Sequence, residues 1–399
     1  MTVLNVLGKI IGMLGSIWLA RCLGPADLGV ISFVMVLQSP LQRIISLGLD
    51  PILVRVTRDM SDPHAQGIFR HFTVLRMRLA LWSLVLWVVV FVVVWFAGRT
   101  ELASVAWILG PLLLAGAINW ISMGQRFGRL REASLVDFVS LSIVAGGLLW
   151  LLVPGASLVT AAWIYCGCNL VGFANSARWG RDVLGGFRQA KDAASFQASV
   201  KIRDGTWPLL IMLASFGYTT LELPLVSFLY GFEQAGFYRV GGTLATGILT
   251  LVGTFGTVMY PRYVEWSKTP ELLALRLRQL GIASAAIALG GIAFLYFSGH
   301  YLLETIFGAQ YVQSFPILIV LGAAKLTILW VNIWSIPLLA LRQEKFVARV
   351  AITVSLLCIL SNLLVSSLNY GGVAVASLSL VSECIVGIVC YWKVRKLLS

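Results

Sequence analysis

The sequence predicts an all-α polytopic membrane protein with about twelve transmembrane helices in two six-helix bundles. Hydrophobic residues make up 59% of the 399 residues and charged residues only 12%, and the mean hydropathy is +0.89. Apolar runs of about 20 residues, the length that crosses the hydrocarbon core, repeat along nearly the whole chain. A glycine-containing stretch near the start also recurs at the middle, which suggests two homologous halves packed around one central site.

The apolar runs define the predicted spans, and none shows the alternating ten-residue pattern of a strand barrel. In the first half the spans are 3–20, 28–49, 74–97, 102–123, 135–153 and 157–177. In the second half they are 206–229, 237–259, 279–298, 315–340, 347–367 and 372–392. Lys9 in the middle of the first run, with no small-residue cleavage pattern after it, argues against a signal peptide.

These spans predict an N-terminal bundle over 1–178, a cytoplasmic linker over 179–205 and a C-terminal bundle over 206–399. The linker carries mixed charges together with Phe187 and Phe196. Such a pattern fits either an amphipathic helix on the membrane surface or a solvated connection, and both interpretations stay open.

Most of the 30 basic residues lie in alternate loops and in the C-terminal tail. The opposite loops hold only Arg21, Arg99 and Arg239, beside several acidic residues. Such asymmetry over short loops places the basic side in the cytoplasm, so both termini are predicted to be cytoplasmic. It also accounts for most of the net charge of +13, so a nucleic-acid partner is not expected.

The recurring glycine stretch runs from Arg21 to Gly29 and again from Tyr230 to Gly236, with the same spacing between its two glycines. Asp50-Pro51 indicates a helix that restarts after the second span, because proline is tolerated in a first turn. Small residues at helical spacing predict close helix packing. They are Gly8, Gly12, Gly15, Gly241, Gly242, Gly253 and Gly256.

Three basic residues, Lys9, Arg43 and Lys325, fall within spans, and Arg21 and Arg239 lie at outer ends. A basic side chain at the centre of a bilayer costs about 2.5–3.5 kcal/mol on insertion scales, so these residues should not face lipid. They either pair with acids, or they line a wet cavity that receives an anion such as a pyrophosphate, simple phosphate or halide. The acidic residues that lie within predicted spans and could pair with them are Asp137, Glu222 and Glu383.

The two deeper acids, Glu222 and Glu383, are candidates for coupling transport to protons or sodium. There is no nucleophile–base motif, no Walker-type phosphate loop and no paired acidic motif near a cytoplasmic face, so we expect a protein that is not an enzyme. The six cysteines and three histidines lack the spacing of a zinc site. We therefore expect no metal and no cofactor.

Several short motifs, in order along nearly the whole chain, resemble those of the polysaccharide flippases. These are the O-antigen and capsule repeat-unit (Wzx-type) exporters of the MATE-like MOP superfamily. The motifs are Arg21–Gly29, Gly48–Asp50 with Arg55, Trp207-Pro208, Gly236–Arg239, Tyr260-Pro261, Leu341–Lys345 and Gly371–Ala376. This chain begins almost inside its first predicted span, whereas members of that family usually carry extra residues before it.

The resemblance implies two six-helix bundles related by a parallel repeat, with an alternating-access cavity between them. It implies a flippase that moves an undecaprenyl-pyrophosphate-linked oligosaccharide across a bacterial inner membrane, in association with other polysaccharide-assembly proteins. Lys9, Arg21 and Arg43 of the first bundle, and Arg239 and Lys325 of the second, would then hold the pyrophosphate. The alternatives are a drug or cation exporter of the same superfamily, a membrane polysaccharide polymerase or ligase, and a non-transporting scaffold.

Overall fold

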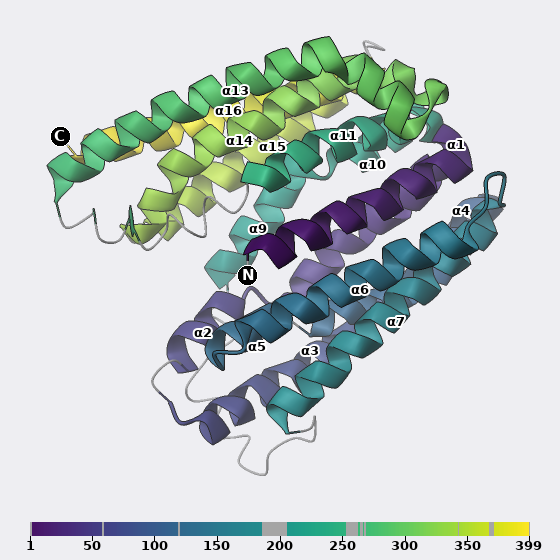
Figure 1. Ribbon diagram of the computed structural model, residues 1–399, viewed down its shortest axis with the longest axis horizontal. Coiled ribbons are helices and arrows are strands. Elements are labelled where there is room, and N and C mark those ends of the chain that lie inside the picture. The colour runs from purple at the N-terminus through teal and green to yellow at the C-terminus, as the bar shows by residue number, and fades with distance from the viewer. Residues whose placement is uncertain are drawn as a thin grey trace. The chain divides into compact units, whose positions relative to one another are not determined.

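The computed structural model describes residues 2–57, 60–118, 120–185, 206–252, 262–263, 266, 269–341, 343–366 and 371–398. The elements in these ranges are helices throughout, as predicted (Figure 1). The chain forms two compact units. The first contains residues 1–23 and 34–212, and the second contains residues 24–33 and 213–399.

Figure 1 labels the helices in chain order. The first part of the chain forms α1 (Thr2–Ser46), α2 (Asp50–Thr57), α3 (Asp62–Phe96), α4 (Thr100–Leu109), a 3₁₀ helix (Gly110–Ala117), α5 (Trp120–Arg126), α6 (Leu130–Leu151) and α7 (Leu158–Leu184). The rest forms α9 (Thr206–Thr219), α10 (Glu222–Tyr230), α11 (Phe232–Val252), α13 (Pro270–Phe307), a 3₁₀ helix (Ala309–Ser314), α14 (Phe315–Ala340), α15 (Glu344–Ser366) and α16 (Gly371–Leu398).

Within the described residues, nine helical segments are long and apolar enough to cross a membrane. This number is smaller than the predicted twelve, because three of the predicted spans differ from the helices of the structure. The first two predicted spans lie in the single helix α1, and the predicted span 206–229 is divided into α9 and α10. Helix α11 carries Glu233, Gln234 and Arg239 in its first turns, which lowers its hydropathy.

The predicted first external loop is a kink inside α1. Its residue Gly24 has φ 77° and ψ 173°, a conformation that a residue with a side chain rarely adopts. Gly231, its counterpart in the second half, has φ 88° and ψ 169° and ends α10. The two copies of the glycine stretch therefore share one backbone bend, followed each time by a new run of helix.

Inside the second unit, the two copies of the glycine stretch also pack against each other. A methyl group added to Gly29 would overlap the carbonyl group of Phe232, and one added to Gly236 would overlap the carbonyl group of Pro25. The Phe33 and Phe232 rings meet edge to face, with centroids 5.7 Å apart. The contact is reciprocal, and it depends on the absence of a side chain at both glycines.

The other predicted small-residue faces are confirmed where the structure describes them. In the first unit, Gly8 faces Leu141 of α6, and a Cβ added to Gly15 would lie 3.0 Å from the Cα atom of Ala145. In the second unit, a Cβ on Gly241 of α11 would lie 3.2 Å from the backbone nitrogen of Leu318 of α14. Gly253 and Gly256 lie outside the described residues.

Helix α7 runs past the predicted end of its span, to Leu184, and Gly185 closes it in the left-handed conformation. The first residues predicted for the linker are therefore helical. The rest of that segment, including Phe187 and Phe196, lies outside the described residues.

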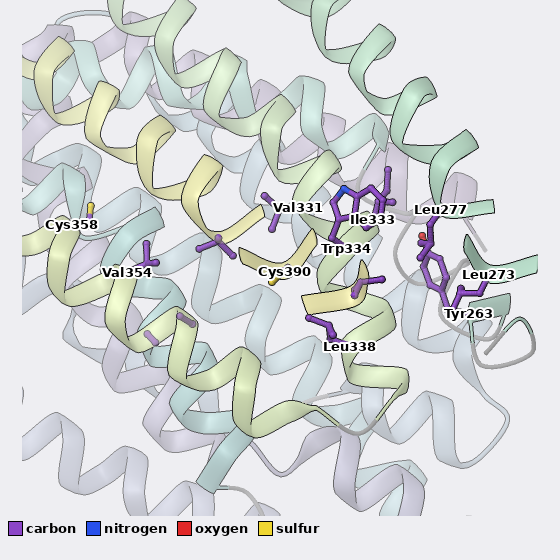
Figure 2. Packing of buried hydrophobic residues seen from close by; sticks show 14 residues of the cluster. Tyr263, Leu273, Leu277, Val331, Ile333, Trp334, Leu338, Val354, Cys358 and Cys390 are labelled. Atoms are coloured by element: carbon purple, nitrogen blue, oxygen red, sulfur yellow. The ribbon is translucent and has the colours of Figure 1, made fainter. Parts of the chain in front are cut away.

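Each unit has its own apolar core. In the second unit the core joins α13, α14, α15 and α16, as Figure 2 shows around Trp334, Val331 and Cys390. The Trp334 ring meets the Tyr391 ring edge to face, with centroids 4.8 Å apart. Cys390 is fully buried among these residues, where its thiol acts as a small apolar group. This core fixes α14 and α16, the helices that carry Lys325 and Glu383.

Candidate functional site

Lys9 of the first unit has an acidic neighbour. It lies on an exposed face of α1 and interacts electrostatically with Asp137 of α6, which is partly buried. Helix α1 approaches α6 at Gly8, where the Leu141 side chain and the Phe138 backbone lie against the glycine, and this packing accounts for the proximity. The sequence left two interpretations of Lys9, pairing with an acid or lining a cavity for an anion. In the structure, Asp137 is available as the acidic partner that the first interpretation requires.

Arg43 and Arg21 lie on α1, after and before its kink. The Nη1 atom of Arg43 donates a hydrogen bond to the carbonyl oxygen of Met212 at 2.9 Å, and the side chain is partly buried. Arg21 is exposed, one turn before Gly24. Arg43 therefore directs part of its guanidinium at protein backbone.

In the second unit, Arg239 follows Tyr238 on α11 and is partly buried, and Lys325 is partly buried near the middle of α14. The neighbours of Lys325 along the helix, Ala324 and Leu326, are almost fully buried. Lys325 therefore extends from a face of α14 that is packed against protein.

The second unit contains a buried polar group that we call the acid–lysine cluster: Glu222, Tyr238, Lys325, Ser379 and Glu383. Glu222 is 3% exposed and Glu383 is 2% exposed. The Tyr238 hydroxyl donates a hydrogen bond to Oε2 of Glu222, and the Ser379 side chain also hydrogen-bonds to Glu222. Lys325 interacts electrostatically with both carboxylates. Helices α10, α11, α14 and α16 thus bring their polar residues to one place.

The sequence predicted Glu222, Glu383 and Lys325 as separate features, and it missed Tyr238. The available signal was the position of Tyr238 in the motif Gly236–Arg239. A tyrosine within a predicted span needs a partner for its hydroxyl. As a marker of family resemblance alone, the motif gives Tyr238 no role.

Arg76, near the start of the predicted span 74–97, is a buried cation that the sequence-based candidates did not include. Arg76 lies on α3 and is 3% exposed. Its Nη1 donates to Oδ1 of Asp50 at 2.8 Å, and its Nη2 donates to the carbonyl oxygen of Ser46 at 2.8 Å. Helix α3 begins at Asp62, earlier than the predicted span, so Arg76 lies well inside the helix and not at its start. The predicted helix restart at Asp50 is confirmed, because α2 begins there.

The five predicted cations are divided between the units. Lys9, Arg21 and Arg43 belong to the first, and Arg239 and Lys325 belong to the second. A shared cationic cavity therefore stays a prediction. In the described part of the chain, no group of three or more histidine, cysteine, aspartate or glutamate side chains is arranged to hold a metal ion.

Residues 18–316 match the family described as polysaccharide biosynthesis protein. The chain belongs to this family. A comparison with curated proteins finds no significant match. Membership of the polysaccharide biosynthesis family, together with the nine candidate spans among the described residues, makes the chain a multi-pass membrane protein of polysaccharide biosynthesis.

Among solved structures, this family member is similar to the lipid II flippase MurJ in an inward closed conformation. The TM-score is 0.75 at 14% identity, over 98% of this chain and 87% of that one. An inward-facing multidrug resistance MATE transporter of the MOP superfamily gives a TM-score of 0.70 at 13% identity, over 98% and 95% of the two chains. A MOP superfamily transporter from Pyrococcus furiosus gives 0.66 at 13% identity, over 100% and 94%. At such identities the likeness establishes the two-lobed MOP fold.

Proposed function

We propose that this protein is a flippase that moves an undecaprenyl-pyrophosphate-linked oligosaccharide across the bacterial inner membrane by alternating access. The observation that carries the proposal is the match to the polysaccharide biosynthesis family over residues 18–316, in a chain with the fold of MOP transporters. The lipid II flippase, which has this fold, is named for a lipid-linked substrate.

The charges within the spans support an anionic substrate. A pyrophosphate carries several negative charges and accepts several charge-assisted hydrogen bonds, so it offsets the desolvation of more than one cation. We assign this role to Lys9, Arg21, Arg43 and Arg239. Lys325 differs from these four because it interacts electrostatically with two buried carboxylates.

The short connections between described helices favour transport over a polymerase or ligase. Helices α3 and α4 are joined by Ala97–Arg99, and α10 and α11 by Gly231 alone. Such connections have no room for a catalytic domain.

The basic residues gathered in alternate loops place both termini in the cytoplasm, and the oligosaccharide is loaded at that face.

The proposal is tested in cells that lack the protein. Lipid-linked repeat units are extracted, and intact spheroplasts are treated with an external glycosidase. Flipping predicts that full-length units accumulate in a protected, cytoplasmic pool and that the intact gene releases them. Units that reach the outer face but stay unpolymerised would instead assign the protein to the polymerase or ligase class.

A drug or cation exporter is the second candidate, and the buried carboxylates of Glu222 and Glu383 favour it, because a cationic substrate needs acidic partners. It is separated by drug susceptibility. An exporter predicts that cells lacking the protein become sensitive to cationic drugs while their surface glycan is unchanged.

A further inference from the structure

The candidate span Thr100–Arg126 of the first unit is not one continuous α-helix. Helix α4 ends at Leu109, a 3₁₀ helix covers Gly110–Ala117, and Ile118 is extended, with φ −117° and ψ 121°. Backbone that leaves the α-helical pattern at membrane depth needs other hydrogen-bond partners, because the hydrocarbon contains no water to supply them. The break therefore requires donors from elsewhere in the unit.

Pro111 accounts for the start of the break. It has no N–H group, so the carbonyl oxygen of Trp107 loses its α-helical donor and accepts from the backbone nitrogen of Gly110. In a continuous helix that nitrogen would donate to the carbonyl oxygen of Ala106. The indole Nε1 of Trp87, from α3, donates to Ala106 at 2.7 Å and takes its place.

Two glutamines of α1 donate to further carbonyl groups of the break. Nε2 of Gln38, which is 2% exposed, donates to the carbonyl oxygen of Leu109 at 2.8 Å. Nε2 of Gln42, about one turn later on the same face, donates to the carbonyl oxygen of Leu112 at 3.3 Å. A Cβ added to Gly116 would lie 3.3 Å from the Cα atom of Gln42, so the two backbones also meet. The turn of α1 between these glutamines is thereby fixed against the broken span.

We propose that Gln38 and Gln42 are positioning residues for Arg43, which follows Gln42 directly. This inference rests on the proposed function, in which Arg43 binds the pyrophosphate of the substrate. The guanidinium donates to the carbonyl oxygen of Met212 at 2.9 Å, so the side chain and the helix turn that carries it are both bonded to backbone of the first unit. A binding side chain is effective only when its own support is fixed. The two amides set the depth and the rotation of this turn and do not contact the substrate.

The test removes each amide and keeps the length of the side chain, with Gln38→Met and Gln42→Met. Gln66→Met is the matched control, because Gln66 of α3 also donates from Nε2 to a backbone carbonyl, that of Val183 of α7, at 2.9 Å. Each full-length variant loses one hydrogen bond of the same kind, so each lowers the unfolding midpoint in detergent by about 2 °C. The three variants are then matched in stability, and only positioning separates them.

The first readout needs no substrate. Arg43→Cys is made in a form without the six native cysteines, and its rate of reaction with a methanethiosulfonate reagent is measured in proteoliposomes. Addition of Gln38→Met or Gln42→Met changes the rate by about threefold or more, because the turn is no longer fixed, and Gln66→Met leaves it unchanged. If the Gln38 variant cannot be purified, Gln42→Met alone decides the result, since Gln42 is only partly buried.

The second readout uses the variants that keep Arg43. Flipping of an undecaprenyl-pyrophosphate-linked oligosaccharide is measured in liposomes over a range of substrate contents. Gln38→Met and Gln42→Met raise the apparent KM by about fivefold, the effect of one lost supporting hydrogen bond, and leave the maximal rate unchanged. Gln66→Met leaves both values unchanged.

An unchanged labelling rate with Gln42→Met, or the same change with Gln66→Met, would overturn the inference. A changed labelling rate with an unchanged apparent KM would overturn it as well, because the fixed turn would then not serve the substrate. If the wild type flips no glycan, the proposed function fails by itself, and the labelling comparison still decides whether the two glutamines position the side chain that follows them.

Discussion

Arg76 is a buried charge of the first unit, and direct contact with the Asp50 carboxylate compensates it. Arg76 is 3% exposed, and its guanidinium donates hydrogen bonds to the Asp50 carboxylate and to the carbonyl oxygen of Ser46 at the end of α1. A charge in this position is tolerated because its partners are already in place. The same logic applies to Lys9 beside Asp137 and to Lys325 beside two carboxylates, where the interaction acts over a longer range.

Arg76→Gln is therefore expected to destabilise the protein by about 3 kcal/mol, because it leaves the Asp50 carboxylate without its cation. The midpoint of thermal unfolding in detergent measures this loss. Arg78→Gln is the matched control, because Arg78 lies on the same helix and is exposed. Equal midpoints for the two variants would show that the Arg76–Asp50 pair does not stabilise the fold.

Arg43→Ala is expected to reduce export of the glycan at least tenfold at normal protein levels, because it removes a cation assigned to the pyrophosphate, and Arg43→Lys should retain part of the activity. Surface glycan and membrane-inserted protein are quantified together. The control is Arg99→Ala, which removes an exposed arginine before α4. Normal surface glycan in Arg43→Ala cells would remove Arg43 from the substrate site.

At the scale of the elements, the apolar runs predicted most helices, because a membrane span requires a long apolar segment and little else. The sequence was less informative about breaks. It predicted the restart at Asp50, where proline gives a signal, but it placed a loop where α1 only bends at Gly24. It could not predict that α3 begins at Asp62, because the polar residues of its first turns have no apolar signature.

The reciprocal glycine contact gives a prediction for these elements. Gly29→Ala is expected to lower the unfolding midpoint, because the added methyl group overlaps the Phe232 carbonyl group, and backbone cannot move aside as a side chain can. The matched control is Gly146→Ala on α6, where an added methyl group meets no atom within 4 Å. In that open helical position alanine is neutral or slightly stabilising. A Gly29→Ala midpoint at or above that of Gly146→Ala would contradict the contact.

At the scale of the whole molecule, the sequence predicted an all-helical, two-lobed membrane protein, and the fold and family confirm it. Residues of the candidate site were harder to predict, because their roles depend on contacts between distant helices. Lys325, Glu222 and Glu383 were each found by their charge inside a span. Nothing in their spacing along the chain indicated that they share one cluster.

The predicted orientation is tested by labelling single cysteines in a form without the six native ones. Cysteine at Ala26, an exposed residue just after the kink in α1, should react with an impermeant reagent in intact cells. Cysteine at Arg131, an exposed residue at the start of α6, should react only after lysis. The opposite pattern would place the termini outside and reverse the direction of transport.

We propose that this chain alone moves a lipid-linked glycan across a bilayer. The direct measurement reconstitutes the purified protein into liposomes that contain an undecaprenyl-pyrophosphate-linked oligosaccharide, with a glycosidase added outside. In protein-free liposomes, only the outward-facing half of the glycan is cleaved. With the wild-type protein the account predicts that cleavage proceeds beyond that half, and that it does so much less with Arg43→Ala. Cleavage that stops at the protein-free level, with correctly folded protein in the membrane, would contradict the account.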